Sequence, residues 1–214
     1  MADEASVINR ALRFLGERPI SNPESPDTDS AKHIVEIFPQ GRRELLRLYP
    51  WNFAEVWDEI DKTTAPKFGY SDAYALPATF LRLLWVLDPD QSTLDYRLLY
   101  QPAPDNRRVI ALDNGGASKL KIGFGADVEI LAHWEPLALK ALSLWLALDA
   151  CKGITGREKH VEMLNELLSE TLKDAFGVDG SEQSIKRHVE SYTQNERNRA
   201  QYGYSAWTNV TGYY

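Results

Sequence analysis

The stretch PLALKALSLWLALDAC, residues 136–151, is apolar on nearly every side of a helix. Proline suits the first turn of a helix, where its missing amide would have no partner, and Gly153 follows as a stop. A helix that is apolar all round is buried by its neighbours. We therefore predict that this helix is the centre of a helical bundle. The run is interrupted by Lys140 and Ser143 and is too short to span a bilayer.

A second helix is predicted directly downstream. Thr155 and Glu158 have the spacing of a capping box, in which each side chain satisfies an amide of the first helical turn. Apolar residues then recur at helical spacing on one stripe up to Gly177, namely Val161, Leu164, Leu168, Leu172 and Phe176.

Two further helices are predicted upstream. Residues 7–15 carry an apolar stripe that ends at Gly16, which can adopt the left-handed conformation of a helix end. The next helix begins at Asp29 or Ser30 as N-cap and stops before Pro50. Because Pro39 lies inside it, a kink or a short break is expected near Phe38.

Residues 51–133, between the two helical pairs, hold short aromatic and β-branched runs separated by proline and glycine. Such runs are typical of strands, here at 79–87, 94–100, 107–112, 118–123 and 127–133. Asn114-Gly115 favours a hairpin turn, because both residues tolerate positive φ.

The predicted fold class is α+β, mainly a helical bundle of about four helices with an inserted small antiparallel β-sheet and an extended C-terminal arm. Residues 1–50 and 134–177 are assigned to the bundle. Residues 51–133 are assigned to the inserted β domain, and 178–214 to a C-terminal helix and arm.

The C-terminal arm is the predicted partner-binding region. Residues 200–214 carry no charge and are rich in tyrosine, and an uncharged aromatic segment is expected to dock on protein. It either folds back on its own body or, as we favour, binds a neighbouring chain or another partner. The residues expected to bind are Ile185, Val189, Tyr192, Tyr202, Tyr204, Trp207, Tyr213 and Tyr214.

Composition narrows the functional classes. The formal charge of −7 and the pI near 5.2 disfavour nonspecific nucleic-acid binding, which needs clustered lysine and arginine. The single cysteine, Cys151, cannot form an intrachain disulfide or a multi-cysteine zinc site. The acidic start, Met1 to Glu4, does not resemble a signal peptide, and no membrane association is expected.

No catalytic, metal-binding or cofactor-binding residue is predicted. The four histidines lie far apart in the sequence, and Cys151 lies in the most apolar helix, where a cysteine is ordinarily a small buried hydrophobe. Glu162, Glu166 and Glu170 share one helical face, which we interpret as solvated because it lies opposite the leucine stripe. No cofactor is therefore expected.

Several short motifs resemble the tail tubular protein A, or head-to-tail adaptor, family of short-tailed phages. The resemblance covers roughly residues 5 to 176, and the helices beginning at Pro136 and near Thr155 fall where the family has them. The motifs are INRAL (8–12), LGERPI (15–20), RELL (43–46), YPWNFA (49–54), YALP (74–77) and LR (81–82).

This resemblance implies a structural virion protein without enzymatic activity. Twelve copies would form a ring beneath the portal protein, with the helical part facing the portal and the β insertion contributing to ring contacts or to the tail nozzle. Tail fibres are further expected partners. Double-stranded DNA would pass through the channel without specific binding. The protein would reside in the host cytoplasm during assembly and then in the virion tail.

Other functions remain open at this stage. A head-completion protein of a long-tailed phage shares the helical architecture, although the large β insertion favours the adaptor. A tail-associated cell-wall hydrolase would need an acid such as Glu162, Glu166 or Glu170 in a carbohydrate cleft. A nucleic-acid-binding module is disfavoured by the acidic body.

Overall fold

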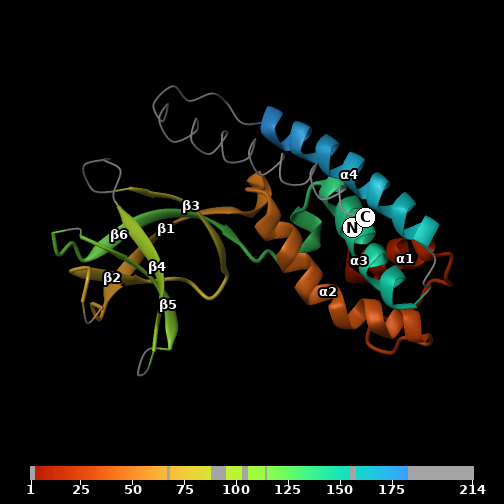
Figure 1. Ribbon diagram of the computed structural model, residues 1–214, viewed down its shortest axis with the longest axis horizontal. Coiled ribbons are helices and arrows are strands. Elements are labelled where there is room, and N and C mark those ends of the chain that lie inside the picture. Colours follow the sequence, from red (N-terminus) through yellow and green to blue (C-terminus); the bar gives the residue numbers. More distant parts are fainter. Residues whose placement is uncertain are drawn as a thin grey trace. The chain divides into compact units, whose positions relative to one another are not determined.

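The computed structural model describes residues 3–66, 68–87, 95–102, 106–113, 115–154 and 158–182. The chain divides into two compact units, Met1–Ser181 and Glu182–Tyr214, and the elements below belong to the first (Figure 1). In chain order they are α1 (Glu4–Leu15), α2 (Asp29–Leu48), a 3₁₀ turn (Asn52–Ala54), β1 (Glu55–Thr63), β2 (Asp72–Ala75), β3 (Phe80–Leu87), β4 (Tyr96–Gln101), β5 (Arg107–Leu112), β6 (Lys119–Ala126), a second 3₁₀ turn (Leu131–His133), α3 (Pro136–Ile154) and α4 (Glu158–Ser181).

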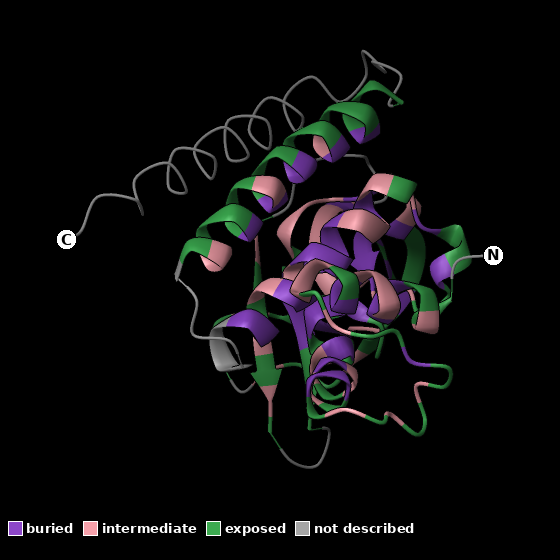
Figure 2. Cartoon of the chain, turned by 90° about the vertical axis from the view of Figure 1, so that its right-hand side faces the viewer, coloured by how far each residue is buried: buried purple, intermediate pink, exposed green. Residues whose placement is uncertain are grey.

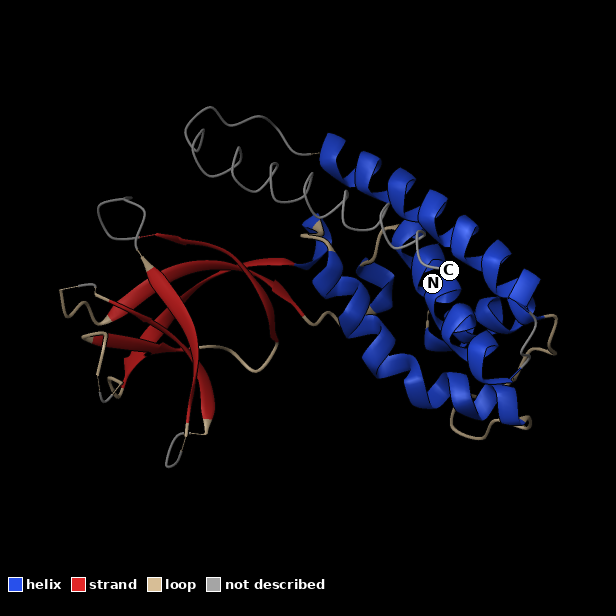
Figure 3. Ribbon diagram, in the orientation of Figure 1, coloured by secondary structure: helices blue, strands red, loops and turns tan. Residues whose placement is uncertain are grey.

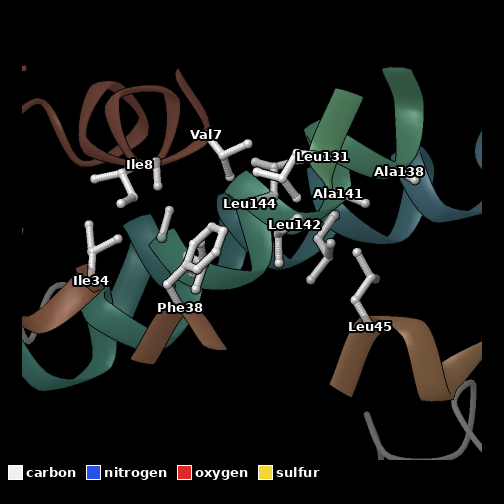
Figure 4. Packing of buried hydrophobic residues seen from close by; sticks show 14 of the residues in the cluster. Val7, Ile8, Ile34, Phe38, Leu45, Leu131, Ala138, Ala141, Leu142 and Leu144 are labelled. Atoms are coloured by element: carbon white, nitrogen blue, oxygen red, sulfur yellow. The ribbon is translucent and has the colours of Figure 1, made fainter. Parts of the chain in front are cut away.

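Helix α3 is the centre of the helical core, as predicted. Its residues Ala138, Leu142 and Leu146 are fully buried, and Cys151 is buried near its end. Figure 4 shows side chains of α1 and α2, among them Ile8 and Phe38, pointing toward α3. α4 packs on α3 through its buried leucines, while its outward face is exposed along its length (Figure 2).

The two N-terminal helices form nearly where expected. α1 ends at Gly16, whose φ of 76° is left-handed. α2 is capped by the Thr28 side chain, one residue before the predicted caps Asp29 and Ser30. Of the two outcomes expected near Phe38, the short break is wrong, because α2 continues through Pro39, and the kink stays a prediction. Buried residues before and after the exposed proline hold both halves of α2 against the core.

The sheet corrects the predicted fold class. The bundle with a small inserted sheet is wrong, because a curled sheet of six antiparallel strands in the order β3-β6-β1-β2-β5-β4 stands beside the four helices (Figure 3). Strands make up 25% of the structure against 48% helix. The sheet encloses a hydrophobic core of its own, built on residues such as Tyr74, Ile110 and Phe124.

Two strands, β1 and β2, were not predicted. Asp and Glu disfavour strands, and β1 carries four acidic residues among its nine. Two of the acids lie opposite lysines of β6, in the pairs Glu59–Lys121 and Asp61–Lys119. Cross-strand pairs of opposite charge stabilise a sheet, so the neighbouring strand compensates for the poor local propensity.

The predicted strand at 127–133 is wrong. Asp127 is bound by arginines of α2, and residues 131–133 form a 3₁₀ turn. The predicted turn at Asn114-Gly115 falls partly outside the described residues. Gly115 and Gly116, between β5 and β6, have positive φ values of 58° and 83°.

Helix α4 extends past its predicted end at Gly177 to Ser181. The extension is held because Asp179 is buried and hydrogen-bonded to Asn52. The capping box at Thr155 lies outside the described residues. No helix in the described ranges is long and apolar enough to cross a membrane.

Candidate interaction surface

The predicted partner-binding residues, Ile185 to Tyr214, lie outside the described part of the chain. The acidic residues considered as candidates in the sequence lie within the described part of the chain. Glu162, Glu166 and Glu170 are exposed on α4, as predicted for a solvated face. Two surface hollows, one beside Asp127 and one beside Lys121, are lined by other residues. Among the described residues, no group of His, Cys, Asp and Glu could hold a metal ion.

The motif residues of the N-terminal helix have a structural role. The Asn9 side chain forms hydrogen bonds with both backbone polar groups of Ile20. Its Oδ1 accepts from the Ile20 amide at 2.7 Å, and its Nδ2 donates to the Ile20 carbonyl at 2.9 Å. Ile20 is 6% exposed and belongs to the helical core. The pairing therefore fastens the loop after α1 to the bundle.

The YPWNFA motif joins the end of α2 to the end of α4. Trp51 is buried and donates its indole Nε1–H to the Leu45 carbonyl at 3.0 Å. Asn52 donates its amide to the Asp179 carboxylate at 3.0 Å and its side-chain N–H to the Asp179 carbonyl at 2.6 Å. Burial, and then the Asp179 carboxylate, raise the pKa of the Tyr49 hydroxyl. Tyr49 also stacks on Phe176 of α4.

A buried ion pair links α2 to the end of β6. The Arg42 guanidinium donates to both carboxylate oxygens of Asp127, at 2.8 and 2.9 Å, and Arg43 donates to the same carboxylate at 2.8 Å. Burial alone would raise the pKa of Asp127, but the hydrogen bonds from the two arginines outweigh it and hold the pKa below its usual value. Electrostatic attraction between the two arginines and Asp127 therefore helps to hold α2 against the end of β6.

The outer face of β1, β6 and β3 carries an aromatic pair, an exposed Trp57 and a half-buried Trp85. Trp57 of β1 and Trp85 of β3 both lie opposite Gly123 of β6 in the ladder. A Cβ on Gly123 would lie 2.2 Å from the Trp85 ring, so only glycine leaves space for that indole. The two rings meet edge to face at 5.2 Å. We call these three residues the tryptophan row.

The tryptophan row combines exposure with local order. Trp57 is 68% exposed, yet its Nε1–H donates to the Glu55 carboxylate at 2.5 Å. The same carboxylate oxygen lies 3.4 Å from the indole nitrogen of Trp85. Tryptophan is the residue type most enriched at binding hot spots, and one that is ordered and uncovered is ready to bind.

Charged residues border the tryptophan row on the same face. Two residues further along the strands, Lys121 of β6 lies between Glu59 of β1 and Leu87 of β3. Two residues beyond that, Lys119 of β6 lies opposite Asp61 of β1. Lys121 forms an ion pair of 3.7 Å with Glu59. Glu59, Leu87, Lys119 and Lys121 line a hollow of about 420 Å³. An aromatic centre with a charged rim is the usual anatomy of a protein interface.

A second exposed surface lies on β4 and β5, at the far end of the strand order. Tyr100 is 65% and Leu98 40% exposed, and the Tyr100 hydroxyl bonds to Asn106 at 3.2 Å. The two strands carry three exposed arginines and no acidic residue. Arg108 lies on the same face as Leu98 and Tyr100, where its guanidinium stacks over the Phe80 ring at 4.9 Å, while Arg97 and Arg107 lie on the opposite face. We call these strands the arginine hairpin.

No family model matches the chain, and no curated protein matches it. The tryptophan row was not identified from the sequence, because it depends on the register of three strands that are distant in sequence. The available signal was Trp57 itself, a large aromatic residue among four acidic ones.

Proposed function

We propose that this protein is a head-to-tail adaptor of a short-tailed phage, a structural virion protein that works by binding and has no catalytic role. In this proposal twelve copies form a ring beneath the portal protein. The tail nozzle binds on the other side, and tail fibres are further candidate partners. Double-stranded DNA passes through the channel without being recognised.

The observation that carries the proposal is the position of the motif residues. Asn9 fastens the loop after α1, Trp51 and Asn52 join the ends of α2 and α4, and Arg82 donates to the Leu48 carbonyl at 3.4 Å. The motifs that resemble the adaptor family therefore lie at the joints of the fold, where a family keeps its architecture. Arg43, the first residue of the RELL motif, lines a surface hollow together with its partner Asp127.

The exposed surfaces support a binding role. The tryptophan row and the arginine hairpin expose Trp, Tyr and Arg, the residue types that dominate binding energy at interfaces. A closed ring needs two different adhesive surfaces on each subunit, because its contacts are heterologous. Both surfaces lie on one sheet.

The end of α4 gives the C-terminal arm a fixed starting point. Asp179 is 2% exposed and is held by both hydrogen bonds from Asn52. The last turn of α4, which precedes the proposed arm in the chain, is thus held by the YPWNFA motif. An arm tethered at a fixed point has a high effective concentration at its binding site once the ring has docked.

The decisive test measures complex mass with the portal ring of the same virus. Full-length protein and a version ending at Glu182 are each measured alone and after mixing with the portal. The version should end at Glu182, because truncation at Gly180 would remove Ser181, the last residue of α4, whose hydroxyl donates to the Val178 carbonyl. We expect portal binding by the full chain and weaker binding by the shortened one.

Absence of portal binding by both proteins would contradict the adaptor proposal. Equal binding by both would contradict a role for the arm while leaving the ring in place. The hydrolase alternative is tested in parallel on peptidoglycan and capsule. Glycan cleavage by the wild type that is lost in Glu166→Gln would overturn the non-enzymatic proposal.

A further inference from the structure

The helices and the sheet enclose separate hydrophobic cores. In the described part of the chain, no residue belongs to both cores. Leu81 of β3 is the one strand residue among them that packs on the helical core, and it is half-buried. Apolar burial is the dominant favourable term in folding, so each core stabilises its own part of the molecule. Other contacts must therefore set the orientation of the sheet on the helices.

Two chain segments connect the helices to the sheet, and they lie side by side. The chain enters the sheet at Glu55, the first residue of β1, and leaves it after Ala126, the last residue of β6. Glu55 lies opposite Gly125 in the β1–β6 ladder. Because opposite residues of antiparallel strands have Cα atoms about 5 Å apart, the covalent connection is narrow enough to allow a rotation.

At the end of α2, two arginines bind backbone carbonyls across the contact with the sheet. Arg47 of α2 donates to the Leu81 carbonyl at 3.1 Å. Arg82 of β3 donates to the Leu48 carbonyl at 3.4 Å. Both acceptors are neutral and arginine is not deprotonated in proteins, so this reciprocal contact does not depend on pH. We call these four residues the pivot.

A second contact lies five residues earlier on α2 and depends on one carboxylate. Asp127 belongs to the sheet, because its amide donates to the Thr79 carbonyl at 2.8 Å beside the β3–β6 ladder. Its carboxylate, 8% exposed, accepts from Arg42 and Arg43 of α2. Five residues span about 7.5 Å along a helix, so this contact acts at a distance from the pivot. We call the contact of Asp127 with Arg42 and Arg43 the latch.

Glu129 is the other acidic group at the latch. Its carboxylate accepts from Arg42 Nη2 at 3.2 Å, but its side chain is 72% exposed. Ion pairs that are open to solvent contribute little, so Glu129 does not replace Asp127. The segment before β3 that borders the latch, Ala78 and Thr79, brings no charge.

An open hollow borders the latch. It has a volume of about 540 Å³ and is lined by Arg43 of α2, by Ala78 and Thr79 before β3, and by residues 127–130 after β6. Ile130 on its wall is 61% exposed. A close-packed contact leaves no room for a rotation, whereas a hollow lined from both sides does.

We infer that the latch is a conformational switch, and that losing the charge of Asp127 lets the sheet turn on the helices about the pivot. A neutral Asp127 no longer attracts the two arginines, while the pivot, both cores and both connecting segments stay intact. The sheet carries the tryptophan row and the arginine hairpin, so the switch re-aims both surfaces. This inference does not depend on the adaptor proposal.

Acid is the means of opening the latch in the wild type. Burial alone would raise the pKa of Asp127, but the hydrogen bonds from Arg42 and Arg43 outweigh it and hold the pKa below its usual value. The latch is therefore closed at neutral pH. It should open only as the pH falls below about 4, the ordinary value for an aspartate.

Spin-label distances test the switch in the full-length protein. One label is attached at Lys173→Cys on α4 and one at Arg97→Cys on β4, both exposed positions, while the native Cys151 is buried. Pulsed electron paramagnetic resonance measures the distribution of distances between the labels at neutral pH. We expect one narrow distribution with Asp127 intact and a wider distribution with a shifted mean in Asp127→Asn.

Two controls separate a rotation from general loosening. Glu166→Gln removes an exposed carboxylate on α4 and should leave the distribution unchanged. Labels at Lys173→Cys and Glu36→Cys, both on helices, should keep one distance in Asp127→Asn, because the helical core is not part of the switch. Far-UV circular dichroism confirms that each labelled protein is folded.

An acid titration of the labelled protein with Asp127 intact gives a second readout, which decides the matter if Asp127→Asn does not fold. The distribution between Lys173→Cys and Arg97→Cys should widen below about pH 4 while the far-UV spectrum stays native. A narrow distribution in acid, or in folded Asp127→Asn, would overturn the switch. Loss of the native spectrum before any widening would overturn it as well, because helices and sheet would then come apart only by unfolding.

Discussion

Trp51 and Trp57 lie six residues apart and have opposite environments. Trp51, in the connection after α2, is 1% exposed and bonds to a backbone carbonyl inside the helical core. Trp57, on the outer face of the sheet, is 68% exposed and bonds to a surface carboxylate. The first residue holds the fold together, and the second is available for binding. Residue type alone therefore does not separate a core residue from an interface residue.

The largest expected effect concerns Trp51. Trp51→Ala should lower the free energy of unfolding by about 3–5 kcal/mol, because it removes buried area and leaves a cavity between α2 and α4. Urea denaturation measures the change. A loss below about 1 kcal/mol would show that Trp51 is not the joint described here.

The second prediction tests the ion pair between the core and the sheet. Arg42→Ala should cost about 3 kcal/mol, since it leaves Asp127 buried without its main partner. The pKa of Asp127 is lowered in the folded state, so its contribution is present above the ordinary carboxylate pKa and is lost as the pH falls through the lowered value.

A pH series checks the sign of that linkage. The wild type should exceed Asp127→Asn in free energy of unfolding, and this difference should be largest near neutral pH and shrink below about pH 4. A difference that grows on acidification would contradict the described role of Asp127. Glu166→Gln, an exposed carboxylate on α4, is the control.

A smaller effect is expected at Gly123. Gly123→Ala places a methyl group 2.2 Å from the Trp85 ring and should displace that indole at a cost of about 1–3 kcal/mol. Near-UV circular dichroism should report the lost Trp57–Trp85 contact, while the far-UV spectrum stays native. Gly177→Ala, where a Cβ meets nothing within 4 Å, should leave the near-UV signal unchanged.

The smallest effect on folding is expected at Trp57. Trp57→Ala should change the free energy of unfolding by less than about 1 kcal/mol, because the ring is largely exposed and only its edge contact with Trp85 is lost. Urea denaturation beside Trp51→Ala gives the comparison directly. Equal losses in both variants would remove the distinction between the two tryptophans.

The helices could be predicted because apolar stripes, capping residues and helix-ending glycines mark them within a short stretch of sequence. α1 combines a regular apolar stripe with Gly16, and α3 is apolar throughout and begins at Pro136. These signals are local in sequence. The predicted break in α2 was wrong because the local cost of Pro39 is outweighed by packing against α3 on both sides of it.

The sheet could be predicted only in part, because its stability depends on partners distant in sequence. β1 resembles a polar loop until its acids are placed opposite Lys119 and Lys121. The tryptophan row needs the register of β1, β6 and β3, which no local pattern reveals. The predicted site in residues 185–214 lies outside the described residues and stays a prediction.

If the adaptor proposal holds, the most direct test compares wild type with Trp57→Ala, each mixed with the portal ring that the proposal gives as its partner. Complex mass is measured together with the free energy of unfolding of each protein. We predict a ring of subunits on the portal for wild type and a complex that has lost most subunits for Trp57→Ala, at nearly equal stability. Equal complex masses for the two proteins would contradict the claim that the outer face of the sheet is a binding surface.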